Sequence, residues 1–190
     1  MTEELSGRSA ALTTFLLLYR VRNFAYRYQV RMLSEYGLTP ERYVVLAAIK
    51  YRDDYMRAAD IGPWLGHNEK TNSLVIDRMV KVGLLNRVQD LPDRRELRLT
   101  ITPKGEKAFA SATPAVHGLI ESVVSSLSDQ EKRTLTDLLQ KVREKAIESL
   151  SQGEGDPAAG TCGTSDLTLI VTTLSKCVPR PKRRPAREAV

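Results

Sequence analysis

The chain has 190 residues, 42% of them hydrophobic, which is enough for one domain with a core and some appendage. Its formal charge of +6 at pH 7 and pI of about 9.4 favour a polyanionic partner, although charge alone does not separate nucleic acid from an acidic membrane. The sequence has no run of about twenty apolar residues that could span a bilayer. The acidic start Thr2-Glu3-Glu4 lacks the basic residues of a secretory signal, so we expect no membrane partner and a cytoplasmic location.

A long first helix is predicted over residues 10–38. Within it, Leu16-Leu17-Leu18-Tyr19 is too continuously apolar for a helix with one side in water, so it needs a second partner surface. Gly37 suits the end of this helix. Thr39-Pro40-Glu41 then opens a second helix with an N-cap residue, a proline at the first helical position and a carboxylate near the positive end of the dipole.

The next strongly patterned segment is an amphipathic helix that begins at Asn68, a good N-cap residue. Gly83 suits the left-handed position that ends it. Its apolar residues recur at helical spacing and predict a buried face of Val75, Ile76, Met79, Val80 and Val82. The other face carries small or polar side chains that could enter a DNA major groove: Lys70, Asn72, Ser73, Asp77 and Lys81.

A β-hairpin is predicted directly after this helix. Residues 84–88 form one apolar strand, residues 90–93 form a turn, and residues 95–101 alternate polar and apolar side chains with period two. The loop carries Asp93-Arg94-Arg95, and paired arginines on a narrow loop suit phosphates and a narrow minor groove. A solvated charged turn is the ordinary explanation for such a loop, but the preceding helix favours DNA.

Two further helices are predicted. Thr102-Pro103 starts the first, which should reach Leu127 and bend at Pro114. Ser128-Asp129-Gln130-Glu131 is a capping box for the second. Its apolar stripe needs a partner helix, naturally residues 10–35 of its own and a second subunit: Leu135, Leu138, Leu139, Val142, Ala146 and Leu150.

The chain changes character after Ser151. Residues 152–160 have the composition of a flexible linker, and the last residues form a basic, proline-broken tail. This tail is either a disordered appendage or a source of extra, sequence-independent contacts with DNA phosphates. Both cysteines, Cys162 and Cys177, lie here, so a disulfide framework does not hold residues 1–150 together.

Three spaced motifs carry a family resemblance. Residues 71–84, Asp93-Arg94-Arg95 and Ile101-Thr102-Pro103-Lys104-Gly105 resemble the winged helix-turn-helix regulators of the multiple-antibiotic-resistance-regulator (MarR) family. The resemblance covers roughly residues 8–150. It implies a mainly α fold with a small β-hairpin wing (α+β), in which Gly62-Pro63 interrupts residues 56–65, the expected first helix of the helix-turn-helix. The implied domains are an N-terminal dimerisation helix (1–38), the winged helix-turn-helix domain (39–102), C-terminal dimerisation helices (103–150) and a disordered basic tail (151–190).

The resemblance also implies a function, that of a homodimeric bacterial or archaeal transcription factor, usually a repressor, that binds double-stranded DNA at an inverted-repeat operator. Asn72 is the best candidate for reading adenine. At Leu74 many relatives have an arginine or another polar residue, so one expected base contact is missing. The implied roles are major-groove contact for Lys70, Thr71, Asn72 and Ser73, minor-groove contact for Arg95 with Arg94 as helper, and wing orientation for Asp93 and Arg78.

Other classes of function are disfavoured. The sequence shows no nucleophile with a base, no paired carboxylates and no phosphate loop, so it predicts no catalytic residue, cofactor or enzyme activity. His67 and His117 are isolated, and no Cys/His spacing resembles a metal site. Two alternatives stay open: a small aromatic or amphipathic effector in a cleft between the dimer helices and the winged domain, or no effector at all. The main alternative function is a winged-helix protein–protein interaction module, which would tolerate alanine at Asn72, Ser73 and Arg95 in a DNA assay.

Overall fold

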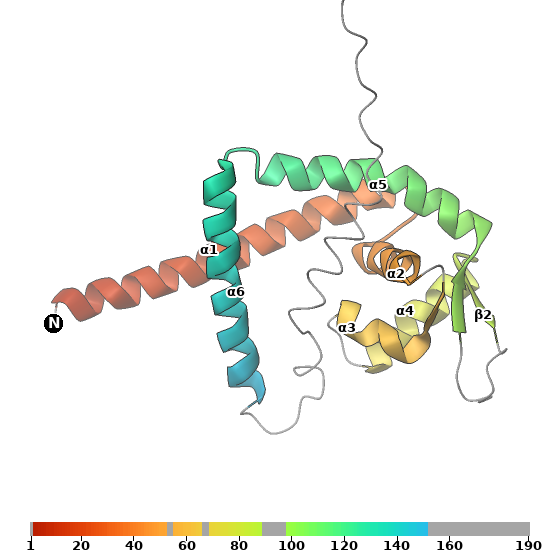
Figure 1. Ribbon diagram of the computed structural model, residues 1–190, viewed down its shortest axis with the longest axis horizontal. Helices are drawn as coiled ribbons and strands as arrows, with labels where there is room; N and C mark the ends of the chain where they lie inside the picture. Colours follow the sequence, from red (N-terminus) through yellow and green to blue (C-terminus); the bar gives the residue numbers. More distant parts are fainter. Residues whose placement is uncertain (1, 53–54, 66–68, 89–97, 152–190) are drawn as a thin grey trace, which may run out of the picture.

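The computed structural model of the chain describes residues 2–52, 55–65, 69–88 and 98–151. In Figure 1, α2, α3, α4 and the strands form a body below α5, while α6 and most of α1 lie to the left of this body. The mainly helical fold with a small antiparallel sheet confirms the predicted fold class. In chain order the elements are α1 (Thr2–Ser34), α2 (Pro40–Tyr51), β1 (Tyr55–Arg57), the 3₁₀ helix η1 (Ala58–Ile61), α3 (Gly62–Leu65), α4 (Glu69–Lys81), β2 (Leu85–Val88), β3 (Arg98–Ile101), α5 (Pro103–Val123) and α6 (Asp129–Ser151).

The turn between α1 and α2 follows the predicted local signals. Gly37 has a positive φ of 69°, a conformation that glycine adopts without strain, and the backbone N–H of Leu38 donates to the Leu33 carbonyl at 3.0 Å. The Thr39 hydroxyl then accepts a hydrogen bond from the backbone N–H of Arg42 at the start of α2. The first helix ends at Ser34, four residues before the predicted boundary, because the turn itself occupies residues 35–37.

The sheet contains a strand that the sequence did not predict. Its three strands lie in the order β1-β3-β2, with both pairs antiparallel, and Met56 of β1 pairs with Leu99 of β3. Residues 56–65 were expected to form a helix interrupted at Gly62-Pro63, but Met56 and Arg57 belong to β1, and the rest consists of η1 and the four-residue α3. Pro63 lacks an N–H donor, so a longer helix would gain little there, whereas β1 completes backbone hydrogen bonds with a strand distant in sequence.

The core of the body surrounds α2. Leu46 and Ile49 of α2 are fully buried together with Met79 of α4, Leu85 of β2 and Leu99 of β3. Large apolar side chains from four elements therefore meet at one point, which stabilises the arrangement of α4 relative to the strands by burying apolar surface.

Contacts between α2 and α5 extend this core. The Tyr43 ring stacks on Phe109 with centroids 5.1 Å apart, and its hydroxyl shares a hydrogen bond of 3.2 Å with Thr113. Lys50 and Glu106 form an ion pair of 2.8 Å between the same helices. Tyr43 is thus a core tyrosine that packs α2 against α5.

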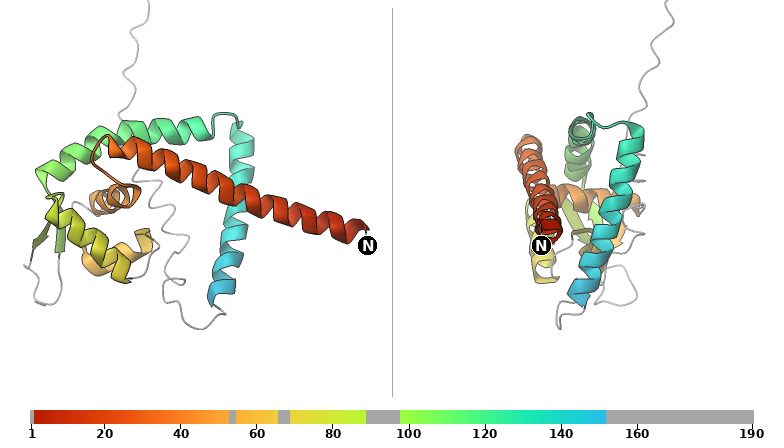
Figure 2. Two further views of the ribbon diagram at one scale, coloured as in Figure 1. Left: turned by 180° about the vertical axis from the view of Figure 1, so that it is seen from behind. Right: turned by 90° about the vertical axis from the view of Figure 1, so that its left-hand side faces the viewer.

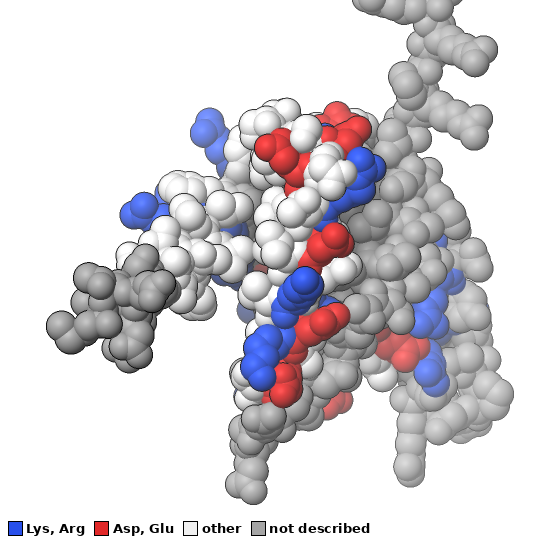
Figure 3. All heavy atoms as spheres, turned by 60° about the vertical axis from the view of Figure 1, so that its left-hand side comes forward, with Lys and Arg blue, Asp and Glu red and all other residues white. Residues whose placement is uncertain are grey.

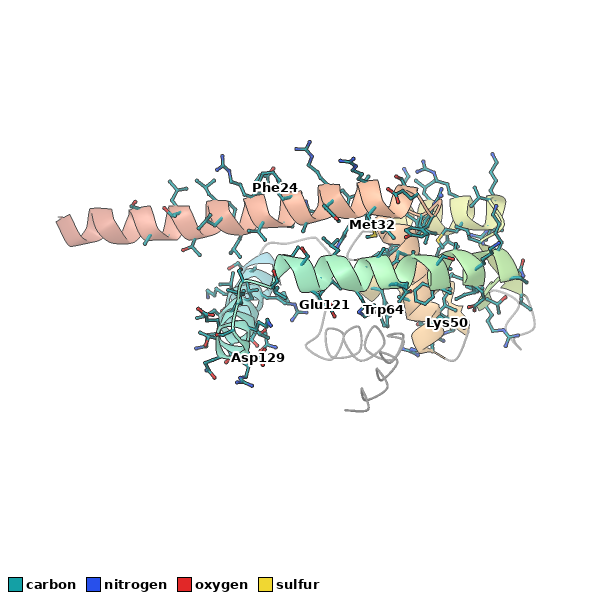
Figure 4. All side chains as sticks on the ribbon, turned by 90° about the horizontal axis from the view of Figure 1, so that it is seen from above. Phe24, Met32, Lys50, Trp64, Glu121 and Asp129 are labelled. Atoms are coloured by element: carbon teal, nitrogen blue, oxygen red, sulfur yellow. The ribbon has the colours of Figure 1, made fainter. Side chains whose placement is uncertain are left out.

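Helix α1 has an anchored part and a projecting part. From above, its C-terminal part, which contains Met32, runs beside α5, and Phe24 lies farther toward the projecting end (Figure 4). The N-terminus lies far from the body in the left-hand view of Figure 2. The Tyr26 hydroxyl donates to the Glu41 carboxylate of α2 at 2.7 Å, and this hydrogen bond raises the pKa of Tyr26 above its usual value.

Helix α6 begins at the predicted capping box. The Ser128 backbone N–H donates to Glu131 Oε2 at 2.8 Å, and the Glu131 N–H donates to the Ser128 hydroxyl at 3.3 Å. The Ser128 hydroxyl also donates to this carboxylate, which lowers the pKa of Glu131. Figure 3 shows acidic and basic side chains along α6 with uncharged surface beside them. In the part of the chain that the structure describes, neither this helix nor any other has the apolar length needed to cross a membrane.

Candidate DNA-binding surface

Helix α4 presents a polar face to solvent and an apolar face to the core. Ile76 and Met79 are buried, while the side chains of Lys70, Ser73 and Asp77 are exposed. The amphipathic helix predicted from the apolar spacing is confirmed. Its last apolar position, Val82, was expected in the buried face but is 39% exposed, because α4 ends at Lys81 and the chain then turns away.

Asn72 lies on the buried face of α4, with an exposure of only 5%. Residues 72, 76 and 79 follow the i, i+4, i+7 spacing of one helix face. A Cβ atom at Gly62 would lie 3.4 Å from Asn72 Nδ2, which locates the amide against the start of α3. The expectation that Asn72 lies on the exposed face was wrong. That prediction rested on the polarity of the side chain, whereas the position of Asn72 around the helix places it with the buried residues. Its predicted contact with adenine does not fit this placement.

The other predicted site residues are described only in part. Lys70 and Ser73 are exposed on the first turns of α4, with half-buried Thr71 between them. Arg78 is exposed one turn further on. The predicted wing residues Asp93, Arg94 and Arg95 lie outside the described residues. The structure therefore exposes two of the four predicted major-groove residues, Lys70 and Ser73, and a third, Thr71, in part.

The end of α4 is fastened to the start of α5. Gly83 has a positive φ of 76° and ends α4 as predicted. The Thr102 hydroxyl donates to the Gly83 carbonyl at 2.7 Å and accepts from the Gly105 N–H at 3.0 Å. Lys104 Nζ donates to the Val82 carbonyl at 2.7 Å. The N-cap of α5 thus also caps α4, which fixes the orientation of α4 relative to β3.

An ion pair that the sequence did not suggest joins α4 to the hairpin. The guanidinium of Arg87, on β2, contacts the carboxylate of Asp77, on the exposed side of α4. The two residues belong to different elements, so no local spacing could have indicated the pair. Arg87 neutralises the one acidic side chain in the middle of this face. Among the described residues, no three His, Cys, Asp or Glu side chains form a group that could hold a metal ion.

The sequence and the fold of this chain are similar to those of known transcriptional regulators. Residues 38–105 match the family described as "Winged helix DNA-binding domain". The crystal structure of a mutant MarR from E. coli, complexed with operator DNA, superposes with a TM-score of 0.63, covering 70% of this chain and 95% of that chain at 22% identity. YkoM of Bacillus subtilis strain 168, an uncharacterized HTH-type transcriptional regulator, is 31% identical over 129 residues, which span 65% of this chain and 82% of YkoM.

The chain belongs to the MarR family. It is also similar to the transcriptional repressor MprA of Escherichia coli K12, with 25% identity over 127 residues, or 66% of this chain and 70% of MprA. These relatives are transcriptional regulators rather than enzymes. This MarR-family chain is accordingly a transcriptional regulator, and its winged helix domain contains α4 and the β2–β3 hairpin.

The ion pair between Asp77 and Arg87 should matter more for DNA affinity than for stability, because exposed ion pairs contribute little to folding. In the MarR-family domain, Arg87→Ala would leave an unpaired carboxylate on the face of α4 that is expected to meet phosphates. We expect a loss of roughly 1 kcal/mol in DNA-binding free energy at low salt, largely recovered when Asp77→Asn is added. A double-mutant cycle measured by fluorescence anisotropy checks this. Equal affinities for the single Arg87 variant and the double variant would show that Asp77 is not the cause.

Proposed function

We propose that this protein is a homodimeric, sequence-specific repressor that reads an inverted-repeat operator. In this proposal α4 enters the major groove and a wing arginine, Arg95 with Arg94 as helper, enters the minor groove. The observation that carries the proposal is the exposed polar start of α4, a helix whose other end is tied to the start of α5 through the Thr102 hydroxyl. A helix whose first turns present small polar and cationic side chains can approach base edges without steric conflict.

The predicted site residues divide into three groups with different proposed roles. Thr71 and Ser73 would meet base edges, and Lys70 would meet a phosphate or a base. Asn72 would act from the buried face by packing α4 against α3, near Gly62. Asp93 of the wing and Arg78 of α4 would orient the wing loop. Asp93 is not proposed to contact DNA, because a carboxylate beside phosphates would be repelled.

The proposed homodimer is supported by large apolar side chains that are exposed to solvent in the single chain. Phe15 and Phe24 of α1 are 66% and 67% exposed, and Leu138 of α6 is 54% exposed. Apolar stripes on two long helices, far from the packed body, are typical of a subunit interface. We propose that a second copy of the chain covers them. The two-fold axis of this dimer would place two copies of α4 on one face of DNA, about one helical turn apart.

Repression and its control complete the proposal. MprA is named as a repressor, and a dimer seated on an operator blocks access to the DNA beneath it. We place this activity in the cytoplasm, where the DNA of a bacterial or archaeal cell lies. A small aromatic or amphipathic effector would bind between the dimer helices and the winged domain, and would lower operator affinity by favouring another spacing of the two α4 helices.

Arg95→Ala is expected to weaken operator binding by about 1–3 kcal/mol, because it removes a cation from the wing. The measurement is a mobility-shift titration against the DNA upstream of the chain's own gene, with unrelated DNA as competitor and with DNA selected from a random pool as a second probe. Arg133→Ala, which removes an exposed arginine from α6, is the matched control and should bind as the wild type does.

The salt dependence and the sequence preference of the same titration together test the proposal against its alternative. Binding to DNA should weaken steeply as salt rises, because phosphate contacts release counterions. A protein-binding winged helix would instead bind selected and unrelated DNA alike, and Arg95→Ala would not change its affinity. Those two results together would contradict the regulator function.

A further inference from the structure

Leu74 is an apolar side chain in the middle of the exposed face of α4. It is 47% exposed, whereas Ile76 and Met79 of the same helix are buried. Exposed Lys70 lies one turn before it, and exposed Ser73 is its neighbour. Its position between polar side chains that are proposed to contact DNA means that Leu74 would be carried into the groove with them.

A leucine side chain has no hydrogen-bonding group, so it can favour only an apolar feature of a base edge. In the major groove that feature is the 5-methyl group of thymine, since the other base edges present donors and acceptors. Covering those polar groups with leucine would remove water from them without replacement hydrogen bonds. A leucine at the centre of the reading face therefore favours thymine and disfavours the other bases.

The neighbouring acidic residue does not compete for this role. A free carboxylate could accept from the amino group of cytosine, but Arg87 of β2 binds Oδ1 of the Asp77 carboxylate, which reduces its capacity to accept from a base. This ion pair also neutralises the negative charge of Asp77 on the exposed face of α4. The base edge nearest the centre of α4 is thus met by Leu74 rather than by an acceptor.

We infer that Leu74 is a specificity-determining residue of this regulator, which selects a thymine in each operator half-site through contact with its 5-methyl group. The inference rests on the proposed function and adds to it the chemical identity of one base. Burial of one methyl group changes affinity by about fourfold, so the preference for thymine over uracil should be of that size for each half-site.

The test uses the full-length protein and DNA selected by it from a random pool. Each conserved thymine of the selected site is replaced in turn by deoxyuridine, which lacks the methyl group but keeps the base pair, and affinities are measured by fluorescence anisotropy. The wild type should lose about fourfold at one position in each half-site. Leu74→Ala should bind thymine and uracil equally at that position. Val82→Ala, which shortens another exposed apolar side chain just after α4, should keep the wild-type preference.

The outcomes distinguish this inference from the proposed function. If the wild type selects a sequence but Leu74→Ala retains the same preference for thymine at every position, another side chain such as Thr71 reads the methyl group and the inference is overturned, while the regulator function stands. If the wild type shows no preference for thymine over uracil at any position, the inference fails in the same way. If the wild type selects no sequence at all, the proposed function fails, and the inference with it.

Discussion

Leu138→Asp is expected to make the protein monomeric and to lower its operator affinity by about a hundredfold or more, because each subunit would then bind its half-site alone. Leu138 is more than half exposed in the single chain, in a stripe with Leu135, Leu139 and Val142 of α6. Two-fold symmetry would bring two new carboxylates into one apolar interface, where they would be desolvated without partners. Light scattering after size-exclusion chromatography and mobility-shift titration measure the two effects.

Gln140→Asp is the matched control for this variant. Gln140 is exposed on α6 two residues beyond Leu138, so the same aspartate is placed on the other side of the helix. This variant should remain dimeric and bind operator DNA with the wild-type affinity. Because Leu138 contributes little to the core of its own chain, both variants should keep the wild-type circular dichroism. A Leu138→Asp protein that is still dimeric would place the subunit interface elsewhere.

Gly105→Ala is expected to lower the free energy of unfolding by about 1–3 kcal/mol, the usual cost of adding a methyl group to a closely packed site. A Cβ atom at Gly105 would lie 2.3 Å from the Leu84 carbonyl oxygen and 2.8 Å from Ile101 Cγ2. The Leu84 carbonyl also accepts from the Thr102 N–H at 3.1 Å, so it cannot move away without loss of that hydrogen bond. The clash therefore outweighs the roughly 1 kcal/mol gain of alanine over glycine in a helix.

Gly118→Ala makes the same change in the same helix and should have the opposite sign. A Cβ atom at Gly118 would meet nothing within 4 Å, so only the helix propensity changes, and the free energy of unfolding should rise by up to about 1 kcal/mol. Urea denaturation followed by circular dichroism, at one protein concentration, measures both variants. Equal shifts in the same direction would mean that the contact of Gly105 with Leu84 does not constrain the junction of α4 and α5.

The candidate site shows where sequence patterns are reliable and where they are not. Lys70 and Ser73 are exposed as predicted, since they lie opposite the apolar stripe of α4. Asn72 is only one residue away, but a rotation of about 100° per residue turns it toward the core. Polarity alone therefore misassigned it. Leu74 is the converse case, an apolar residue that the same rotation turns toward solvent.

The caps and turns at helix ends were determined by the sequence itself, because their hydrogen bonds join residues only a few positions apart, although α1 ends at Ser34 and α5 at Val123, each four residues before the predicted end. The turns at Gly37 and Gly83, the cap at Thr39 and the Ser128–Glu131 box all appear where the sequence places them. Tertiary structure alone decided the pairing of β1 with β3, the ion pair between Asp77 and Arg87, and the close approach of Gly105 to Leu84. Each of these joins residues that are adjacent only after the core has packed, so no local pattern in the chain could indicate them.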